Sequence, residues 1–169
     1  GMTSEQWHNL LARGIKIQKF KEITWNGELE SYFIQRKPQL DQVVYSLIRN
    51  HDAGIIQELY FRIQENENSF AQLAMDYSEG EEAKTGGLIG PVEINTPHPK
   101  IAQMLKSSRA GQVWAPTRVG DWFVIVRLEK FITAHLDEAM KQRLRDELFQ
   151  QWLKKQMKTL VSYYESEHN

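Results

Sequence analysis

The sequence predicts an α+β protein in which a small antiparallel sheet with surrounding helices is inserted between helices from the two chain ends. Two apolar runs, Val43 to Ile48 and Phe123 to Val126, have the β-branched content typical of strands. Both chain ends instead repeat their apolar residues at helical spacing. We therefore expect three parts: an N-terminal helical arm at 1–38, a sheet-containing domain at 39–133, and a long C-terminal helix at 134–169.

Composition limits the classes of function. The chain has 169 residues, of which 41% are hydrophobic and 25% charged, enough for one ordinary domain with an appendage. Its net charge of −1 gives no clustered positive charge for nucleic acid or an anionic membrane. No apolar run approaches the roughly 20 residues that cross a bilayer, so we expect no membrane insertion. Without cysteine there is no disulfide framework.

We also expect no metal and no cofactor. The histidines lack the spacing of metal ligands. They are His8, His51, His98, His135 and His168. The start of the sequence lacks the basic region and long apolar stretch of a secretory signal, which predicts a cytoplasmic protein. Gly1 before Met2 indicates a tag remnant, so a longer precursor stays open.

The N-terminal arm reads as two helices. Thr3 and Gln6 have the spacing of a capping box, and we expect the first helix to end at Gly14. A second helical pattern covers residues 27–37 and should end at Pro38. These residues carry more apolar groups than a short arm can bury by itself, so they must pack on another part of the chain.

The C-terminal segment is the expected partner. From Leu136 to about Tyr164 it has no glycine or proline, and its apolar residues recur four apart. Such a helix would reach about 45 Å, too long for the sheet domain alone to cover. We therefore expect one helical module built from both chain ends. A helix that only closes the domain core, or that joins two copies as a homodimer, remains the alternative.

The middle of the chain contains the remaining elements. Ser69 and Gln72 predict a capped helix that stops near Tyr77, because glycines follow from Gly80 onward. The pair Gly120-Asp121 has the chemistry of a tight hairpin turn. The other expected elements are a strand at 40–49, a helix at 55–63, a short helix at 98–108 and a strand at 122–127.

Several motifs in this region occur in an order found in a known family. They are YSE at 77–79, GGLIG at 86–90, AGQV at 110–113 and DWFVIVRLE at 121–129. Over roughly residues 41–130 the sequence resembles the parvulin-type (rotamase, or PpiC) family of peptidyl-prolyl cis-trans isomerases. The resemblance implies an antiparallel sheet of about four strands surrounded by helices. The layout with flanking helices is similar to SurA-like chaperones and, more loosely, to trigger factor.

The family's polar site residues are replaced in this sequence. Its first strand usually carries a Ser-His pair and its closing strand a Gly-aromatic-His sequence. Ser46 is kept, but Leu47 and Phe123 stand where the two histidines would be. Gly80 takes a position where the family often has Cys or Asp. We therefore assign no catalytic residue.

The apolar positions of the family's proline pocket are retained. Ile89 matches its pocket leucine, and Ile101 and Met104 lie on the helix that normally lends a side chain to the pocket. The resemblance implies substrate contacts by Tyr45, Leu47, Ile89, Ile101, Met104 and Phe123. The same side chains would also fit an ordinary core. The GGLIG segment is no phosphate loop, because it neither follows a strand nor opens a helix with Lys-Ser/Thr.

Two functions of different class follow. The first is a peptidyl-prolyl isomerase-like foldase or chaperone that acts weakly on X-Pro bonds of unfolded or proline-containing polypeptides. The alternative is a non-catalytic peptide-binding chaperone or adaptor. In either case the terminal helices could join two copies as a homodimer. The loop at 49–52 is too short and too balanced in charge to favour phosphorylated partners.

Overall fold

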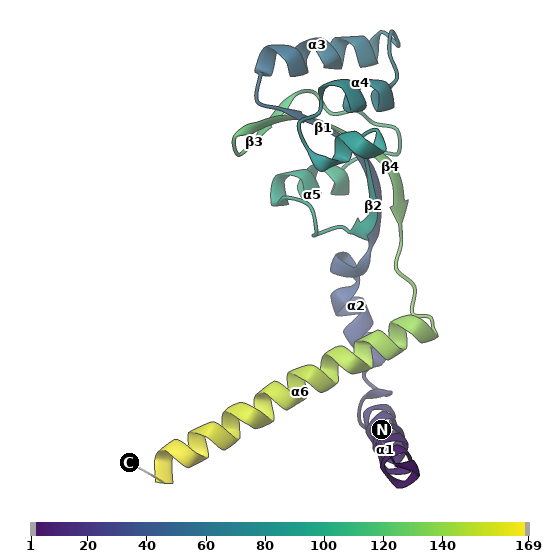
Figure 1. The fold of residues 1–169 in the computed structure, drawn as a ribbon, viewed down its shortest axis with the longest axis vertical. Coiled ribbons are helices and arrows are strands. Elements are labelled where there is room, and N and C mark those ends of the chain that lie inside the picture. The colour runs from purple at the N-terminus through teal and green to yellow at the C-terminus, as the bar shows by residue number, and fades with distance from the viewer. Residues whose placement is uncertain (1–2, 168–169) are drawn as a thin grey trace. The chain divides into compact units, whose positions relative to one another are not determined.

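The computed structural model describes residues 3–167 and divides into two compact units. One unit combines the chain up to Arg36 with the chain from His135 onward, and the other is Lys37–Ala134. The expected α+β class is confirmed, because helices of the first unit accompany a four-stranded antiparallel sheet in the second (Figure 1).

The first helix, α1 (Ser4–Trp25), begins with the predicted capping box. The Thr3 side chain accepts from the Gln6 amide, and the Gln6 side chain accepts from the Thr3 amide. The predicted end at Gly14 is wrong, since α1 continues to Trp25. One glycine in a helix costs only about 1 kcal/mol, which the packing of α1 against another helix offsets.

That partner is α6 (Glu138–Glu167), and aromatic rings join the two helices. The Phe20 ring lies 5.4 Å from the Trp152 ring, and the Trp25 ring lies 6.1 Å from the Phe149 ring, measured between centroids. A salt bridge of 2.6 Å between Lys21 Nζ and the Asp146 carboxylate adds to this contact. The predicted association of the two chain ends in one helical module is therefore confirmed.

The intervening helix α2 (Leu29–Leu40) corrects a second expected boundary. It runs past Pro38 to Leu40. Proline removes one backbone donor, the N–H that would bond the Ile34 carbonyl, but only two residues of the helix follow Pro38, so a single bond is lost near its end. The Asp41 amide still donates to the Lys37 carbonyl at 3.1 Å.

The second unit is organised by a sheet in the order β2-β1-β4-β3, with every neighbouring pair antiparallel. Its strands are β1 (Gln42–Asn50), β2 (Leu88–Glu93), β3 (Thr117–Val119) and β4 (Trp122–Ile132). The two apolar runs expected at the centre lie side by side, as in the pairing of Leu47 with Val126. The predicted turn at Gly120-Asp121 joins β3 to β4.

Each face of this sheet has its own helices and its own apolar cluster (Figure 1). Helix α5 (Pro99–Lys106) covers one face, and helices α3 (Ala53–Gln64) and α4 (Phe70–Tyr77) cover the other. We call the clusters the α5-side cluster and the α3/α4-side cluster. Successive strand residues point to opposite faces, so Leu47 enters the first cluster and Ile48 the second.

The loop before β2, which includes the short 3₁₀ helix Glu81–Thr85, approaches β1 closely at one glycine. Gly87 has φ +83°, and a Cβ there would lie 2.7 Å from the Leu47 carbonyl oxygen. The Leu47 amide also donates to the Gly87 carbonyl at 2.9 Å. Only glycine fits this position, because any side chain meets both backbone strain and backbone atoms.

We predict that Gly87→Ala lowers the free energy of unfolding by roughly 3 kcal/mol, combining strain at positive φ with a steric clash. Gly120→Ala is the matched control: its φ is +61°, yet nothing lies within 4 Å of an added Cβ. It should lose only about 1 kcal/mol. Urea unfolding measures both, and equal losses would contradict the steric account of Gly87.

Candidate functional site

Five of the six residues expected to contact substrate lie together on the α5 side of the sheet. Tyr45 and Leu47 come from β1, Ile89 from β2, and Ile101 and Met104 from α5. Tyr45 pairs with Ile89 across the two strands. All except Ile89 are buried, with relative exposures of 5–7%. The four buried residues belong to the core cluster between α5 and the sheet, and the half-buried Ile89, Trp114 and Trp122 pack against its edge. We call this edge and the buried residues beneath it the apolar surface, and the buried residues its floor.

The sixth residue, Phe123, lies on the other face. Its ring packs against the α3/α4-side cluster, whereas the preceding Trp122 packs against the α5-side cluster. The expectation that Phe123 shares the apolar surface is not met, because neighbouring residues of a strand alternate between faces. Ser46 alternates in the same way, and its hydroxyl donates to Glu129 Oε1 at 2.5 Å.

The position of Gly80 is filled by two neighbouring side chains. A Cβ on Gly80 would collide with the Arg49 guanidinium and with the Glu82 carboxylate. The backbone of Gly80 is extended, with φ −110° and ψ 175°, so a side chain here would not strain the backbone but would displace the ends of the Arg49 and Glu82 side chains. The Glu82 carboxylate thus lies beside the Gly80 Cα and occupies the space where a side chain of residue 80 would begin.

Glu82 is held firmly in this place. Its side chain is 4% exposed, and one carboxylate oxygen lies 3.0 Å from Arg49 Nε. The Ser78 hydroxyl donates to the same carboxylate oxygen at 2.7 Å, and the Arg49 amide donates to that hydroxyl at 3.0 Å. A buried carboxylate is tolerated when it has a cation and hydrogen-bond donors around it.

Arg49 connects this polar group to the apolar surface. Its guanidinium carbon lies 5.1 Å from the centre of the Trp122 ring, in cation-π geometry. Its side chain is 33% exposed, so the pair faces solvent at one end. The sequence interpretation missed Arg49, Glu82 and Trp122. No periodicity separates Glu82 from the neighbouring acids, and Trp122 could be placed only once the strand register was known.

Tyr45 borders both the apolar floor and this ion pair. Burial raises the pKa of its phenol, the negative charge of Glu82 raises it further, and the charge of Arg49 partly opposes the shift. The phenol therefore stays protonated at neutral pH and can donate a hydrogen bond.

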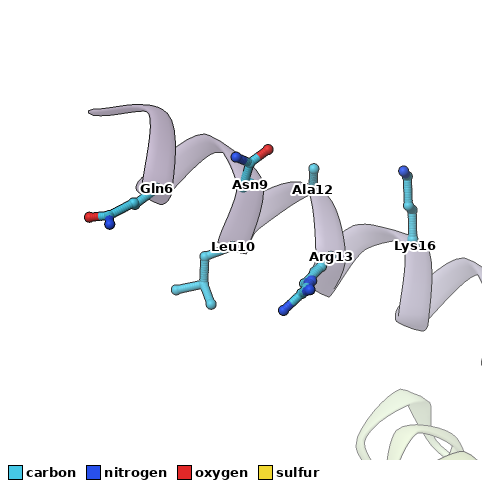
Figure 2. A pocket seen from close by; sticks show the side chains of 6 residues that line it. All are labelled: Gln6, Asn9, Leu10, Ala12, Arg13 and Lys16. Atoms are coloured by element: carbon cyan, nitrogen blue, oxygen red, sulfur yellow. The ribbon is translucent and has the colours of Figure 1, made fainter. Parts of the chain in front are cut away.

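Two surface hollows help to locate the site. One lies between α5 and β3 and includes Met104 and Trp114 in its lining. The other lies on α1, and Figure 2 shows that all six lining side chains come from that single helix. A hollow bounded by one helix has no opposing wall to hold a ligand, so the α5 side of the sheet is the candidate site.

Metal and membrane features complete the survey. Across residues 3–162 no three His, Cys, Asp or Glu side chains gather closely enough to hold a metal ion, and His168 lies outside this range. In that same stretch none of the helices combines the length and the apolar character needed to cross a bilayer.

The tight fit above Gly80 is testable. Gly80→Ala should separate Arg49 from Glu82 and lower the free energy of unfolding by about 1–2 kcal/mol, because a buried carboxylate would lose part of its pairing. In an Arg49→Ala/Glu82→Ala background the same change should be neutral within about 0.5 kcal/mol. Thermal unfolding of the four proteins measures the coupling, and equal effects in both backgrounds would contradict the arrangement.

Comparison with known proteins agrees with this geometry. Residues 49–130 match the family described as Rotamase: PPIC-type PPIASE domain. No curated protein is similar enough to match the chain.

Three solved structures illustrate the likeness. The parvulin domain of PpiD from E. coli is 25% identical over 59% of this chain and 97% of its own, with a TM-score of 0.50. PrsA from Bacillus anthracis is 19% identical over 85% of this chain and 73% of its own, with a TM-score of 0.54. A structure described with two SurA-like chaperones of Campylobacter jejuni is 13% identical over 94% and 70%, with a TM-score of 0.52.

The last two likenesses extend beyond the sheet unit into the flanking helices, and they concern the fold alone. The family match, the likeness to the PpiD parvulin domain and the four-stranded sheet identify residues 49–130 as a domain of the parvulin-type, or PpiC, family of peptidyl-prolyl isomerases.

Proposed function

We propose that this chain is a peptidyl-prolyl isomerase-like foldase that binds proline-containing polypeptides on the α5 side of its sheet and isomerises X-Pro bonds weakly. The observation that carries the proposal is a single apolar surface with a buried floor of Tyr45, Leu47, Ile101 and Met104. Ile89 and Trp122 keep part of this surface accessible at its edge.

Such a surface can promote isomerisation without an acid, a base or a nucleophile. The barrier of roughly 20 kcal/mol comes from amide resonance, and the planar amide is more dipolar than the twisted one. An apolar environment that excludes water therefore favours the twisted form, and binding that form more tightly than the planar one is sufficient for catalysis.

The weak rate follows from the replaced polar groups. Leu47 and Phe123 cannot donate hydrogen bonds, and Gly80 has no side chain. By analogy with oxyanion donors, each missing donor to the twisted amide lowers the rate by about 10²-fold.

Exchange spectroscopy by NMR tests the function. A proline-containing peptide with substoichiometric protein should show slow but measurable cis-trans exchange above the uncatalysed rate. Turnover equal to that of a fully active parvulin would contradict the weak activity, and absence of peptide binding in a titration would contradict the whole proposal.

One substitution tests the location of the surface. Ile89→Asp should weaken peptide binding at least about 10-fold, because it puts a charge into an apolar contact. Leu88→Asp is the matched control, since Leu88 is the preceding residue of β2, points to the other face and is 49% exposed. Titration calorimetry distinguishes them, and equal losses would place the binding surface elsewhere.

A second function, that of a non-catalytic chaperone, is supported by the helical unit. Several of its large apolar side chains are exposed, among them Ile23 at 85%, Ile34 at 71% and Met157 at 64%. Exposed apolar side chains of this kind suit contacts with unfolded chains or with a second copy of the protein. A homodimer formed through these helices would show as a concentration-dependent mass in sedimentation.

Aggregation assays test the chaperone function. We expect Ile23→Gln/Ile34→Gln to reduce suppression of aggregation of an unfolded client at least about 2-fold, because apolar contact area is lost. Phe61→Gln, which alters an exposed apolar side chain of the sheet unit at 53% exposure, should have no effect. The reverse ranking of the variants would place the chaperone surface on the sheet unit.

A further inference from the structure

Tyr45 carries a polar hydroxyl in a site where the polar residues usual in the family are replaced. The role of this hydroxyl is not explained by those replacements. Tyr45 is 5% exposed and lies in the floor of the apolar surface. Among the residues that the structure describes, no hydrogen bond to its hydroxyl is present. The hydroxyl oxygen is not among the buried side-chain atoms that lack a partner in the described part of the chain, so it keeps contact with solvent and a bound ligand can reach it.

Neither of the nearest charged groups accepts the phenol proton of Tyr45. The Glu82 carboxylate is engaged by Arg49 and Ser78. Arg49 has no acceptor atom, and its guanidinium lies over the Trp122 ring. The ion pair therefore makes one end of the apolar floor polar without using the Tyr45 hydroxyl.

Proline-containing peptides have the complementary chemistry. An X-Pro bond carries no N–H, so at that bond a peptide offers only acceptors. As the bond twists, resonance is lost and the lone pair localises on nitrogen, which strengthens it as an acceptor. A neutral hydroxyl at the polar end of an apolar surface suits this group, and burial together with the charge of Glu82 keeps the phenol protonated by raising its pKa.

We propose that Tyr45 is the substrate-contacting donor of this site: its hydroxyl donates a hydrogen bond to the X-Pro amide of a bound polypeptide. This inference rests on the proposed function and assigns a polar role within that site. The Arg49–Glu82 pair is a positioning element behind it, because together with Ser78 it holds the segment carrying Gly80 against β1.

Tyr45→Phe tests the donor with little change in packing. Tyr60→Phe is the matched control, since Tyr60 is partly buried on the α3/α4 side of the same sheet. The probe is a short Ala-Pro-containing peptide, measured with the full chain in two ways: cis-trans exchange by NMR, and the dissociation constant by titration.

We expect Tyr45→Phe to lower the exchange rate at saturation about 10-fold and to raise Kd by up to about 10-fold, the effect of one lost hydrogen bond. Tyr60→Phe should change neither quantity. Unchanged rate and Kd in Tyr45→Phe would overturn the inference while the proposed function stands.

The other outcomes separate the two proposals. A wild-type protein that binds the peptide without exchange would overturn the isomerase function, and a raised Kd in Tyr45→Phe would still support the contact. A wild-type protein that binds no peptide would overturn both. Equal losses in Tyr45→Phe and Tyr60→Phe would show a general effect of lost hydroxyls on stability and would overturn the specific contact.

Discussion

The antiparallel pairing of β1 with β4 is the constraint on which the sheet unit depends. These two central strands have helices over both faces, so alternate residues of each strand enter two separate apolar clusters. A shift of this pairing by one residue would turn the side chains of one strand to the opposite faces, so that Leu47 would leave the α5-side cluster and Ile48 would leave the α3/α4-side cluster. The core, the apolar surface and the ion pair therefore all depend on the register in which β1 pairs with β4.

Much of this architecture could be predicted from local patterns. Capping residues and helical periodicity located α1, α4 and α6, and β-branched content located β1 and β4. The helix ends predicted at Gly14 and Pro38 are wrong for related reasons. At Gly14 helix packing, and at Pro38 the position near the helix end, outweigh the low helix propensity of a single residue.

The site was less accessible to sequence reasoning. Alternation within β4 separates Trp122 from Phe123, but which of them faces α5 depends on pairing with β1, a long-range property. The ion pair between Arg49 and Glu82 likewise joins segments that are distant in sequence, and Gly80 indicates nothing by itself. Substrate contact by the predicted residues and a cytoplasmic location stay predictions.

The first and last residues of the sheet unit lie close together, which has a consequence beyond this protein. Gln42 near its entry pairs with Ile132 near its exit, and the Ala134 amide donates to the Asp41 carboxylate at 2.8 Å. The unit thus begins and ends at one point, as a hairpin does. An insertion with adjoining ends imposes little separation on its host, so a parvulin domain of this form could be moved between helical scaffolds, or removed from one, by joining two neighbouring backbone positions.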